Sequence, residues 1–285
     1  MNPIDQLKTS AELIQQLRPS YQEILGFWKN VFIAQEESRT EIILEPVTIE
    51  QSLLDLKKNS EMPLIDPSQF QVDTDSASQL LVKICQLAIL HAPNLSENAA
   101  HLKSTVDGGG INPQQLFDSI LSDHQSQLEN ISRQLDIPVS ELMLFGYHSI
   151  IPSLSICAQQ LVAYLDDAHQ HIHGYCPICG NQPDLAILDE AGKKSLTCHF
   201  CRHQWITKRM GCSFCDNLEP DKQQYFYSAE EKEYRVNLCD NCNKYLKVVD
   251  LRHMNRYFYP ALESITTLHL DMKAREQGFH NDIGE

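Results

Sequence analysis

Four Cys-x-x-Cys pairs lie within 67 residues of the chain, at Cys176/Cys179, Cys198/Cys201, Cys212/Cys215 and Cys239/Cys242. Each pair presents two thiolates from one tight turn, and a soft divalent ion takes four thiolates at the corners of a tetrahedron. The four pairs therefore predict two tetrathiolate metal centres. Sequential pairing is the economical arrangement, with the first two pairs around one ion and the last two around the other.

The four thiolates of each predicted centre leave no coordination position open for a substrate, which is typical of a structural metal site. Redox-active dithiols are the alternative that the same spacing allows. The metal itself stays open between zinc and iron. Spacing alone favours zinc. The segment Cys176-Pro-Ile-Cys179-Gly180, however, has the Pro and Gly of a rubredoxin-type knuckle, which the other three pairs lack.

Several further residues could do chemistry but have a simpler explanation. His169, His171 and His173 alternate just before the first knuckle, and alternate histidines at a domain junction are more often solvated than bound to metal. Asp166 and Asp167 have no partner nearby in the sequence, so we expect a solvated helix end.

The remaining candidates are expected to be structural. His199 and His203 should lie beside a knuckle without binding metal, and Trp205 should pack in the small core between the ribbons. Cys85 and Cys157 fall on apolar helix faces and should be buried as apolar residues. The sequence has no phosphate loop, Ser/His/Asp arrangement or dinucleotide fingerprint, so we predict no catalytic or organic-cofactor site.

The charge of the chain is strongly acidic before the cysteines. Residues 1–170 carry 9 Lys and Arg against 22 Asp and Glu, whereas residues 171–285 carry 14 against 16. Two M²⁺(Cys⁻)₄ centres would each add about −2. Neither part therefore offers the positive field on which sequence-independent phosphate binding depends. Basic residues around the ribbons still keep a nucleic-acid-binding protein open as an alternative: Lys193, Lys194, Lys208, Arg209, Lys244 and Lys247.

The compartment can be inferred from the same residues. The first residues show no basic region followed by an apolar one, so we expect no secretory signal. The most apolar stretch, residues 142–165, is interrupted by His148, Pro152 and Gln159, which indicates buried helices and not a membrane span. Clustered metal-binding Cys-x-x-Cys pairs are typical of a reducing compartment. We therefore expect a cytoplasmic protein without membrane contact.

The first 170 residues are predicted to form about five to seven helices, because apolar residues recur at steps of three and four. Helices are expected at 4–17, 21–35, 76–90, 114–135 and 139–169, the last one bent or split at Pro152. The type of segment 41–49 is not decided by its composition. Residues 62–67 should be extended, because prolines lie near both ends.

From residue 171 onward a knuckle–hairpin–knuckle unit occurs twice, with 18 and 23 residues between its cysteine pairs. Segments 185–188 and 195–198 flank a turn and predict one hairpin, and 225–227 and 234–239 predict the other. Residues 202–211 join the two units. A last helix is expected over 257–276, with Leu262, Ile265, Leu268 and Met272 on one face.

These patterns predict an α+β protein. Its parts are an all-α N-terminal domain at 1–170, two tandem rubredoxin-like or zinc-ribbon modules at 171–211 and 212–256, and a C-terminal helix and tail at 257–285.

Three motifs around the knuckles have a distinctive amino-acid sequence. They are His173-Gly-Tyr-Cys-Pro-Ile-Cys-Gly-Asn-Gln-Pro183; Leu196-Thr-Cys-His-Phe-Cys-Arg-His-Gln-Trp205 with Arg209 and Cys212/Cys215; and Cys239-Asp-Asn-Cys-Asn-Lys-Tyr-Leu-Lys247. In this order they resemble the three motifs of the formate dehydrogenase accessory protein family, FdhE. Residues 261–279 also fit, so the resemblance covers about 171–279. Upstream it is limited to a helical domain and the segment at Pro63.

The resemblance implies a cytoplasmic, non-catalytic maturation factor. Such a protein would bind the catalytic subunit of formate dehydrogenase, which carries a molybdenum or tungsten cofactor, before or during its assembly or export. It also implies that the eight paired cysteines hold two iron or zinc centres. Two alternatives remain, an iron-containing redox protein and a zinc-ribbon nucleic-acid-binding protein, and a homo-oligomer is left open.

Overall fold

The computed structural model describes residues 2–165, 173–228 and 230–281. The chain divides into two compact units. One contains residues 1–47 and 65–160, and the other contains residues 48–64 and 161–285. The segment 48–64 therefore groups with the cysteine-bearing part of the chain, although it precedes most of the helices in the sequence. Histidines 169 and 171 and aspartates 166 and 167 lie outside the described residues.

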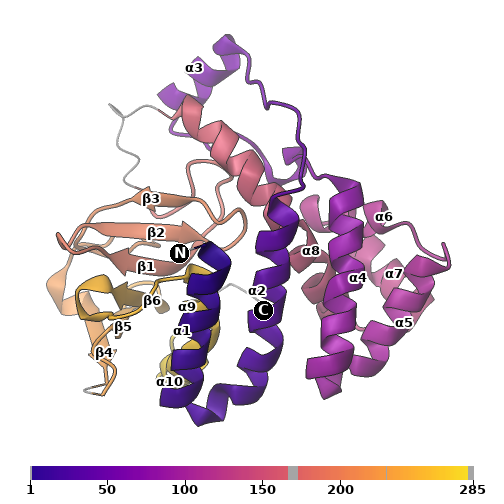
Figure 1. Ribbon diagram of the computed structural model, residues 1–285. Helices are drawn as coiled ribbons and strands as arrows, with labels where there is room; N and C mark the ends of the chain where they lie inside the picture. Colours follow the sequence, from indigo (N-terminus) through magenta and orange to yellow (C-terminus); the bar gives the residue numbers. More distant parts are fainter. Residues whose placement is uncertain (1, 166–172, 229, 282–285) are drawn as a thin grey trace. The chain divides into compact units, whose positions relative to one another are not determined.

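The first unit is built from α-helices (Figure 1). Its helices are α1 (Pro3–Leu17), α2 (Gln22–Arg39), α4 (Thr74–His91), α5 (Ser96–Asp107), α6 (Pro113–Leu121), α7 (Gln125–Leu135) and α8 (Val139–Leu161). The helices predicted near 4–17, 21–35 and 76–90 are thereby confirmed. Helix α2 packs between α1 and α4, and α4 also packs against α5.

Helix starts in this unit follow local capping chemistry. The side-chain oxygens of Asn2, Asp73 and Asn112 each accept a backbone N–H two or three residues ahead, at 3.0 Å. Pro3 and Pro113 occupy the first turns that follow, where a missing N–H costs nothing. The segment 114–135 contains two helices and not one, because Asp123 between them has a left-handed φ of 50°.

Helix α8 continues through Pro152, so of the two predicted alternatives, a bend or a split at this proline, the split is wrong. A proline inside a helix removes the N–H that would bond to the carbonyl four residues earlier. That carbonyl belongs to His148, and here it accepts a hydrogen bond from Gln35 Nε2 on α2 at 2.7 Å. The side chain of Gln35 thus replaces the missing helical donor.

The second unit contains a six-stranded sheet with the strand order β3-β2-β1-β6-β5-β4. Its strands are β1 (Pro183–Leu188), β2 (Lys194–Cys198), β3 (Gln204–Ile206), β4 (Gln223–Tyr227), β5 (Tyr234–Cys239) and β6 (Lys244–Asp250). Strands β1 and β2 form the first predicted hairpin and β4 and β5 the second, both antiparallel, which confirms them.

The two ribbons are joined into this one sheet by a parallel pair. Strand β1 of the first ribbon runs beside β6 of the second, in register from Leu185↔Lys247 to Leu188↔Asp250. The central strands are almost fully buried, as parallel strands usually are. The two ribbons therefore share one continuous sheet.

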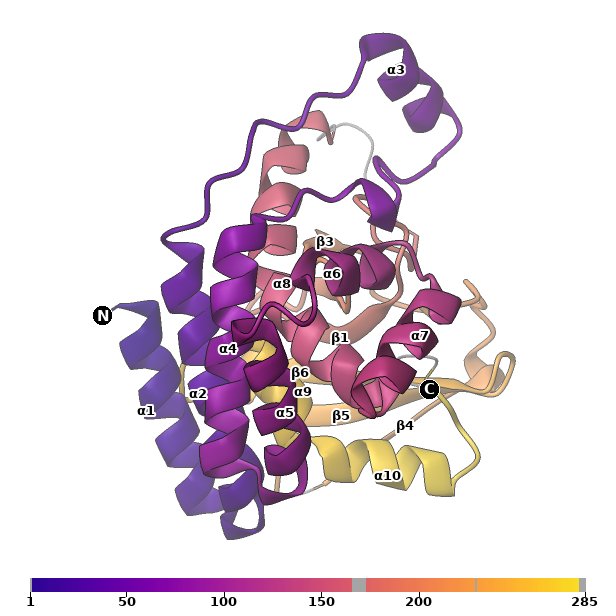
Figure 2. The same cartoon turned by 90° about the vertical axis from the view of Figure 1, so that its right-hand side faces the viewer.

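Helices α9 (Pro260–Thr266) and α10 (Leu268–Glu276) are the last helices of the described chain, and α10 lies against β5 and β6 (Figure 2). The single predicted helix is interrupted because Thr267 leaves the helical region at φ −120°, ψ 22°. This break between α9 and α10 changes which of their side chains face inward. Leu262 is buried, whereas Met272 is 64% exposed. The predicted common face for these two residues is therefore wrong.

Buried polar contacts attach these two helices to the sheet. Lys247 Nζ of β6 lies 2.6 Å from Asp271 Oδ2 of α10. Arg256 Nη1 lies 2.6 Å from Glu263 Oε1 of α9, and the hydroxyl of Tyr234 on β5 donates to the same carboxylate. Each buried charge has an opposite charge and further hydrogen bonds, which burial requires.

The rest of the second unit consists of short elements. Helix α3 (Gln51–Asn59) belongs to it. Short 3₁₀ turns in both units lie at Pro19–Tyr21, Pro67–Gln69, Pro93–Leu95, Val162–Tyr164, Pro220–Lys222 and Leu251–His253. Within the described residues, no helix has the length and apolar character needed to cross a membrane.

Candidate metal centres

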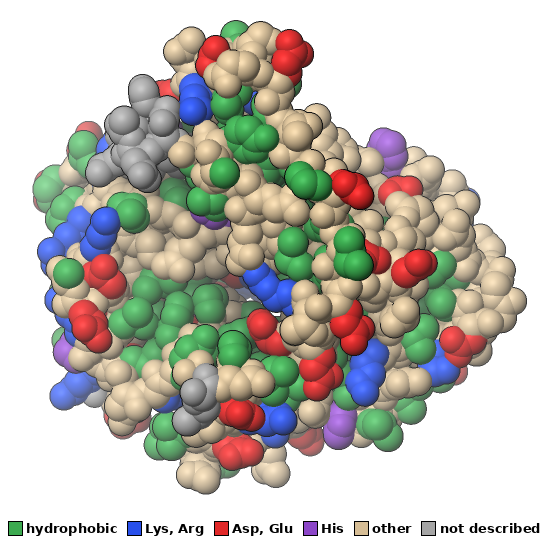
Figure 3. Space-filling view, turned by 45° about the horizontal axis from the view of Figure 1, so that its top comes forward, with side chains coloured by type: hydrophobic (Ala, Val, Ile, Leu, Met, Phe, Trp, Pro, Cys, Tyr) green, Lys and Arg blue, Asp and Glu red, His purple; other side chains and the backbone are tan. Residues whose placement is uncertain are grey.

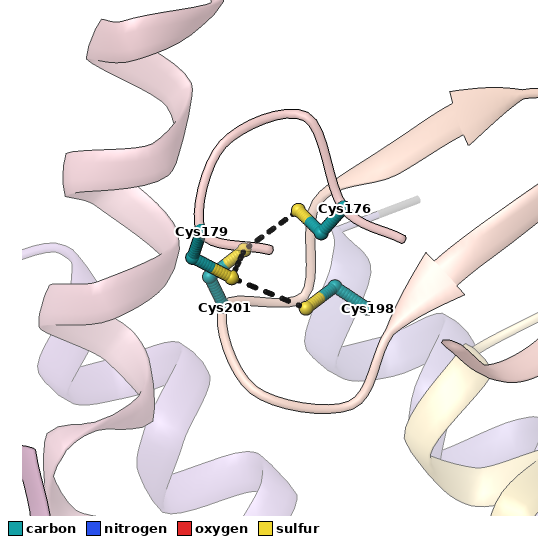
Figure 4. A group of neighbouring side chains, drawn as sticks. All are labelled: Cys176, Cys179, Cys198 and Cys201. Atoms are coloured by element: carbon teal, nitrogen blue, oxygen red, sulfur yellow. Dashed lines mark hydrogen bonds between the residues drawn. The ribbon is translucent and has the colours of Figure 1, made fainter. Parts of the chain in front are cut away.

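The first two cysteine pairs come together in the fold as one tetrad, formed by Cys176, Cys179, Cys198 and Cys201 (Figure 4). The sulfurs point toward one another from two facing loops. The Cys179 sulfur lies 3.6 Å from those of Cys198 and Cys201, and Cys176 lies 3.6 Å from Cys201. A tetrahedral ion with metal–sulfur bonds of about 2.3 Å requires sulfur–sulfur distances of about 3.8 Å. The donor set therefore fits a bound metal ion.

The last two pairs form a second tetrad of Cys212, Cys215, Cys239 and Cys242. Its sulfurs lie 3.7 Å apart in the pairs Cys212–Cys242 and Cys215–Cys239. The two tetrads differ in access to solvent. All four cysteines of the first are buried, whereas Cys215 and Cys242 of the second are partly exposed. The sequential pairing expected from the spacing is the one in which the structure groups the cysteines.

One backbone conformation recurs after the second cysteine of every knuckle. Gly180 has φ +76° there, and the three residues at the corresponding positions also have positive φ: Arg202 at 62°, Asp216 at 54° and Asn243 at 56°. A left-handed residue costs little for glycine and more for other types. Four knuckles of equal length thus share one turn, although only the first has the glycine that favours it.

Hydrogen bonds within the knuckles repeat with the same spacing. The N–H of Gly180 donates to the carbonyl of Cys176 at 2.8 Å, and Asn243 donates likewise to Cys239 at 2.8 Å. Backbone N–H groups also point at sulfur, with Phe200 N 3.4 Å from Cys198 Sγ and Phe214 N 3.3 Å from Cys212 Sγ. Such donors stabilise a thiolate and orient it toward a metal.

The protonation of these thiols depends on what lies between them. Burial raises the pKa of the Cys176 and Cys201 thiols, whereas hydrogen bonds from its three neighbours lower the pKa of Cys179. In the second tetrad, burial raises the pKa of Cys242 to about 11. Four thiolates this close repel one another, so full deprotonation at neutral pH needs a cation between them.

The first tetrad is closed by a segment from far upstream. Leu64 N donates to Pro177 O at 3.0 Å, and the hydroxyl of Tyr175 donates to Glu61 O at 2.6 Å. The ring of Pro63 lies so near Gly180 that a Cβ on this glycine would be 2.9 Å from Pro63 Cγ. Residues 61–64, expected to be extended from Met62 onward, therefore lie directly on the first knuckle.

The described histidines of this region, His173, His199 and His203, are not among the grouped metal-ligand candidates. His173 Nε2 lies 2.8 Å from Glu61 Oε2, and His199 Nδ1 lies 2.9 Å from Gln182 O. The ring of His203 stacks on Trp205, which is 5% exposed and donates Nε1–H to His173 O at 3.0 Å. The expected burial of Trp205 is confirmed, and its position in a core between the ribbons stays a prediction. Cys85 and Cys157 are fully buried, as expected for apolar residues, and burial raises the pKa of both.

Two positions that join the ribbons were not identified from the sequence. Lys194 of β2 is 3% exposed, and its Nζ donates to Ser213 Oγ in the third knuckle at 2.9 Å. Gly174 packs so closely on the backbone of Ser213 that a Cβ there would lie 1.3 Å from the Ser213 oxygen. A glycine two residues before the first knuckle was the available signal for this contact.

The basic residues that keep nucleic acid open as a partner are partly used inside the fold. Lys194 and Lys247 are buried, and Lys244 lies 5.3 Å from the ring centroid of Phe214. On the face drawn in Figure 3, basic side chains are interspersed with acidic ones. This distribution does not favour binding to a phosphate backbone.

The fold and the two tetrads define a class of protein with an α-helical unit and a unit that carries two tetracysteine centres on one sheet. No protein-family model matches the chain. A protein of Aquifex aeolicus called "Protein FdhE homolog" is 25% identical over 272 residues, which is 94% of this chain and 89% of that protein.

Other relatives carry the same name. The protein of Haemophilus ducreyi is 30% identical over 107 residues, and that of Pseudomonas aeruginosa is 30% identical over 116. These two alignments span only 34% and 36% of the relatives' length, and 36% of this chain in each case. The crystal structure of the FdhE protein from Pseudomonas aeruginosa matches with a TM-score of 0.65 at 18% identity, over 99% of this chain and 95% of that one. It therefore has the same fold, and the resemblance to the FdhE family is confirmed.

Proposed function

We propose that this protein is a cytoplasmic, non-catalytic maturation factor for formate dehydrogenase, which binds the catalytic subunit during assembly. The observation that carries this proposal is the similarity to FdhE homologues along 94% of the chain, together with two tetrads that fit closed metal centres. Four thiolates fill the coordination sphere of an ion and leave no position for a substrate. A binding role therefore agrees better with the site than a catalytic one.

Each tetrad would hold one iron or zinc ion in this proposal. The ligands would be Cys176, Cys179, Cys198 and Cys201 in the first ribbon and Cys212, Cys215, Cys239 and Cys242 in the second. The ions would supply folding free energy, because each ribbon alone buries little apolar surface. Residues 171–211 and 212–256 would thus be held as rigid modules.

Deletion of the gene and co-purification test this function together. The deletion strain should lose formate dehydrogenase activity, and the tagged protein should recover the catalytic subunit in stoichiometric amount. Wild-type protein should restore activity to the strain, while a chain with Cys176→Ser and Cys212→Ser should not. Full formate dehydrogenase activity in the deletion strain would contradict the proposal.

An iron-containing redox protein is the second candidate, and one observation favours it. The N–H groups of Phe200 and Phe214 point at cysteine sulfurs, an arrangement that tunes the potential of iron–thiolate centres. Absorption spectra of protein purified without oxygen decide this point, because ferric tetrathiolate is coloured and zinc tetrathiolate is not. A colour change that reverses when a redox partner is added would favour the redox function. A colourless protein with two zinc ions would exclude electron transfer.

A further inference from the structure

Strand β4 is the outermost strand at one end of the six-stranded sheet (Figure 1). The Asp240 N–H donates to Lys222 O at 3.0 Å. In an antiparallel pair every second residue of a strand forms hydrogen bonds with the neighbouring strand. In the β4–β5 register, residues 222, 224 and 226 are therefore the ones that bond to β5. The N–H and C=O groups of Tyr225 and Tyr227 therefore point away from the sheet. The structure records no hydrogen bond to these groups from the described residues. Unpaired backbone of this kind is a template for an added strand.

The same two residues present an exposed aromatic pair. Tyr225 and Tyr227 are 63% and 59% exposed, and their rings stack with centroids 6.2 Å apart. Phe226 lies between them in the strand, so its side chain points to the opposite face, where it packs against the core of the sheet. Exposed tyrosines give large contact area at low entropic cost and are enriched where proteins bind one another.

One guanidinium group, that of Arg235, lies beside this aromatic pair, whereas the Arg209 guanidinium lies against Gly192 in the turn between β1 and β2. Arg235 is directly opposite Tyr227 in the β4–β5 register, and its buried Nε has no hydrogen-bond partner among the described residues. Burial lowers the pKa of Arg235, and the nearby charges of Arg252 and Arg209 lower it further. The carboxylate of Asp250 attracts Arg235 but hydrogen-bonds to Arg252, at 2.8 and 2.5 Å.

Arg235 is therefore a positive charge near this edge that has no hydrogen-bonded carboxylate among the described residues, in a chain whose formal net charge is −15. Arg209 is exposed, and no carboxylate is recorded as bonded to it or to Arg235 within the described parts of the chain. The positive charges of Arg235 and of the exposed Arg209 would attract carboxylates of a partner, because guanidinium groups form strong charge-assisted bonds with them.

We propose that the edge of β4, with Tyr225 and Tyr227 and with the positive charges of Arg235 and Arg209 nearby, binds an extended acidic segment of a partner protein as a seventh strand. Backbone hydrogen bonds to Tyr225 and Tyr227 would fix the register of the added strand against β4. The stacked tyrosine rings would cover its apolar side chains, and the arginines would attract its carboxylates. If the proposed function holds, this surface is where the catalytic subunit is bound, and only this link to the subunit depends on that function.

A pair of synthetic peptides tests the surface without reference to any subunit. The probes are a fluorescein-labelled Thr-Glu-Val-Glu-Val-Glu-Thr peptide and its counterpart with lysine for glutamate, titrated against the full-length, metal-loaded protein. The acidic peptide should bind at least about tenfold more tightly than the basic one, with affinity that falls as salt rises. Arg209→Glu and Tyr225→Ala/Tyr227→Ala should each weaken its binding by about tenfold or more.

Lys8→Glu is the matched control, because it reverses another exposed charge, on α1, and should leave binding unchanged. Circular dichroism and metal content should be the same for every variant. A second measurement asks whether the purified catalytic subunit competes with the peptide. Competition supports both the surface and the proposed function; a subunit that does not bind at all contradicts the function and leaves the surface standing. Equal or absent binding of the two peptides, or unaltered binding to both variants, overturns the docking surface.

Discussion

Lys194 and Ser213 are hydrogen-bonded across the two ribbons, with Nζ 2.9 Å from Oγ. Lys194 belongs to β2 of the first ribbon, and Ser213 lies inside the third knuckle, next to Cys212. The lysine is 3% exposed, which is rare for an ammonium group. A centre of four thiolates and one divalent ion has a charge of about −2, so a buried cation beside it offsets part of that charge. The bond therefore connects the fold of one ribbon to the cysteine tetrad of the other.

Lys194→Met should weaken the second centre, because it keeps the apolar stem and removes the ammonium. Groups beyond the ligands typically change metal affinity by about tenfold or more. We expect one of two metal ions to be lost to a chelator roughly tenfold faster than in the wild type. Lys193→Met is the control, because Lys193 is the adjacent, exposed lysine. If the Lys194→Met and Lys193→Met variants release metal at the same rate, Lys194 does not stabilise the second centre.

The two centres should differ in how fast they release metal. Every cysteine of the first tetrad is buried and residues 61–64 lie on its knuckle, whereas Cys215 and Cys242 are partly exposed. A colorimetric chelator should therefore remove the ions in two phases of equal amplitude. Cys242→Ser should abolish the fast phase and leave the slow one, and Cys198→Ser should do the reverse. A single phase in the wild type would contradict this difference.

Gly174→Ala should be among the most destabilising single substitutions in the second unit. Its new methyl group would lie 1.3 Å from the Ser213 carbonyl oxygen, so two backbone segments would have to separate. We expect a loss on the order of 3 kcal/mol in the free energy of unfolding, at the upper end for overpacking. Gly26→Ala in α2 is the control. It meets no atom within 4 Å and should be neutral or stabilising by up to about 1 kcal/mol. Chemical denaturation of the metal-loaded protein measures both.

Asp216→Gly should stabilise the second ribbon. Asp216 is exposed and has φ 54°, and a left-handed conformation costs roughly 1 kcal/mol for a residue with a Cβ. The expected gain is up to about 1 kcal/mol, because glycine loses more entropy on folding. Gly180→Ala makes the reverse change at φ +76° and also brings a methyl group toward Pro63, so it should destabilise. A lower thermal midpoint for Asp216→Gly would show that the aspartate stabilises the turn by other means.

The sequence predicted the parts of this molecule that depend on short spacing. The Cys-x-x-Cys knuckles, the β1–β2 and β4–β5 hairpins and the helix start at Pro113 all rest on residues within about two dozen positions of one another. In each of them, the local pattern and the final contact involve the same residues. That is why spacing alone grouped Cys176 with Cys198 and not with Cys239.

Features that depend on distant contacts were not predictable in this way. The parallel pairing of Leu185 with Lys247 joins the ribbons through residues 62 positions apart, and no local pattern encodes it. Gln35 supplies the hydrogen bond that Pro152 cannot make, so the apparent helix break depended on a residue in another helix. Residues 61–64 lie on the first knuckle because Leu64 bonds to Pro177.

The most direct test of the two metal centres is metal analysis combined with X-ray absorption on protein produced anaerobically at native levels. Two ions per folded chain, each surrounded by four sulfur atoms at about 2.3 Å, are the expected result, and the absorption edge will identify iron or zinc. A folded, metal-free protein that retains all eight reduced thiols, or ions bound by oxygen and nitrogen instead of sulfur, would contradict the account.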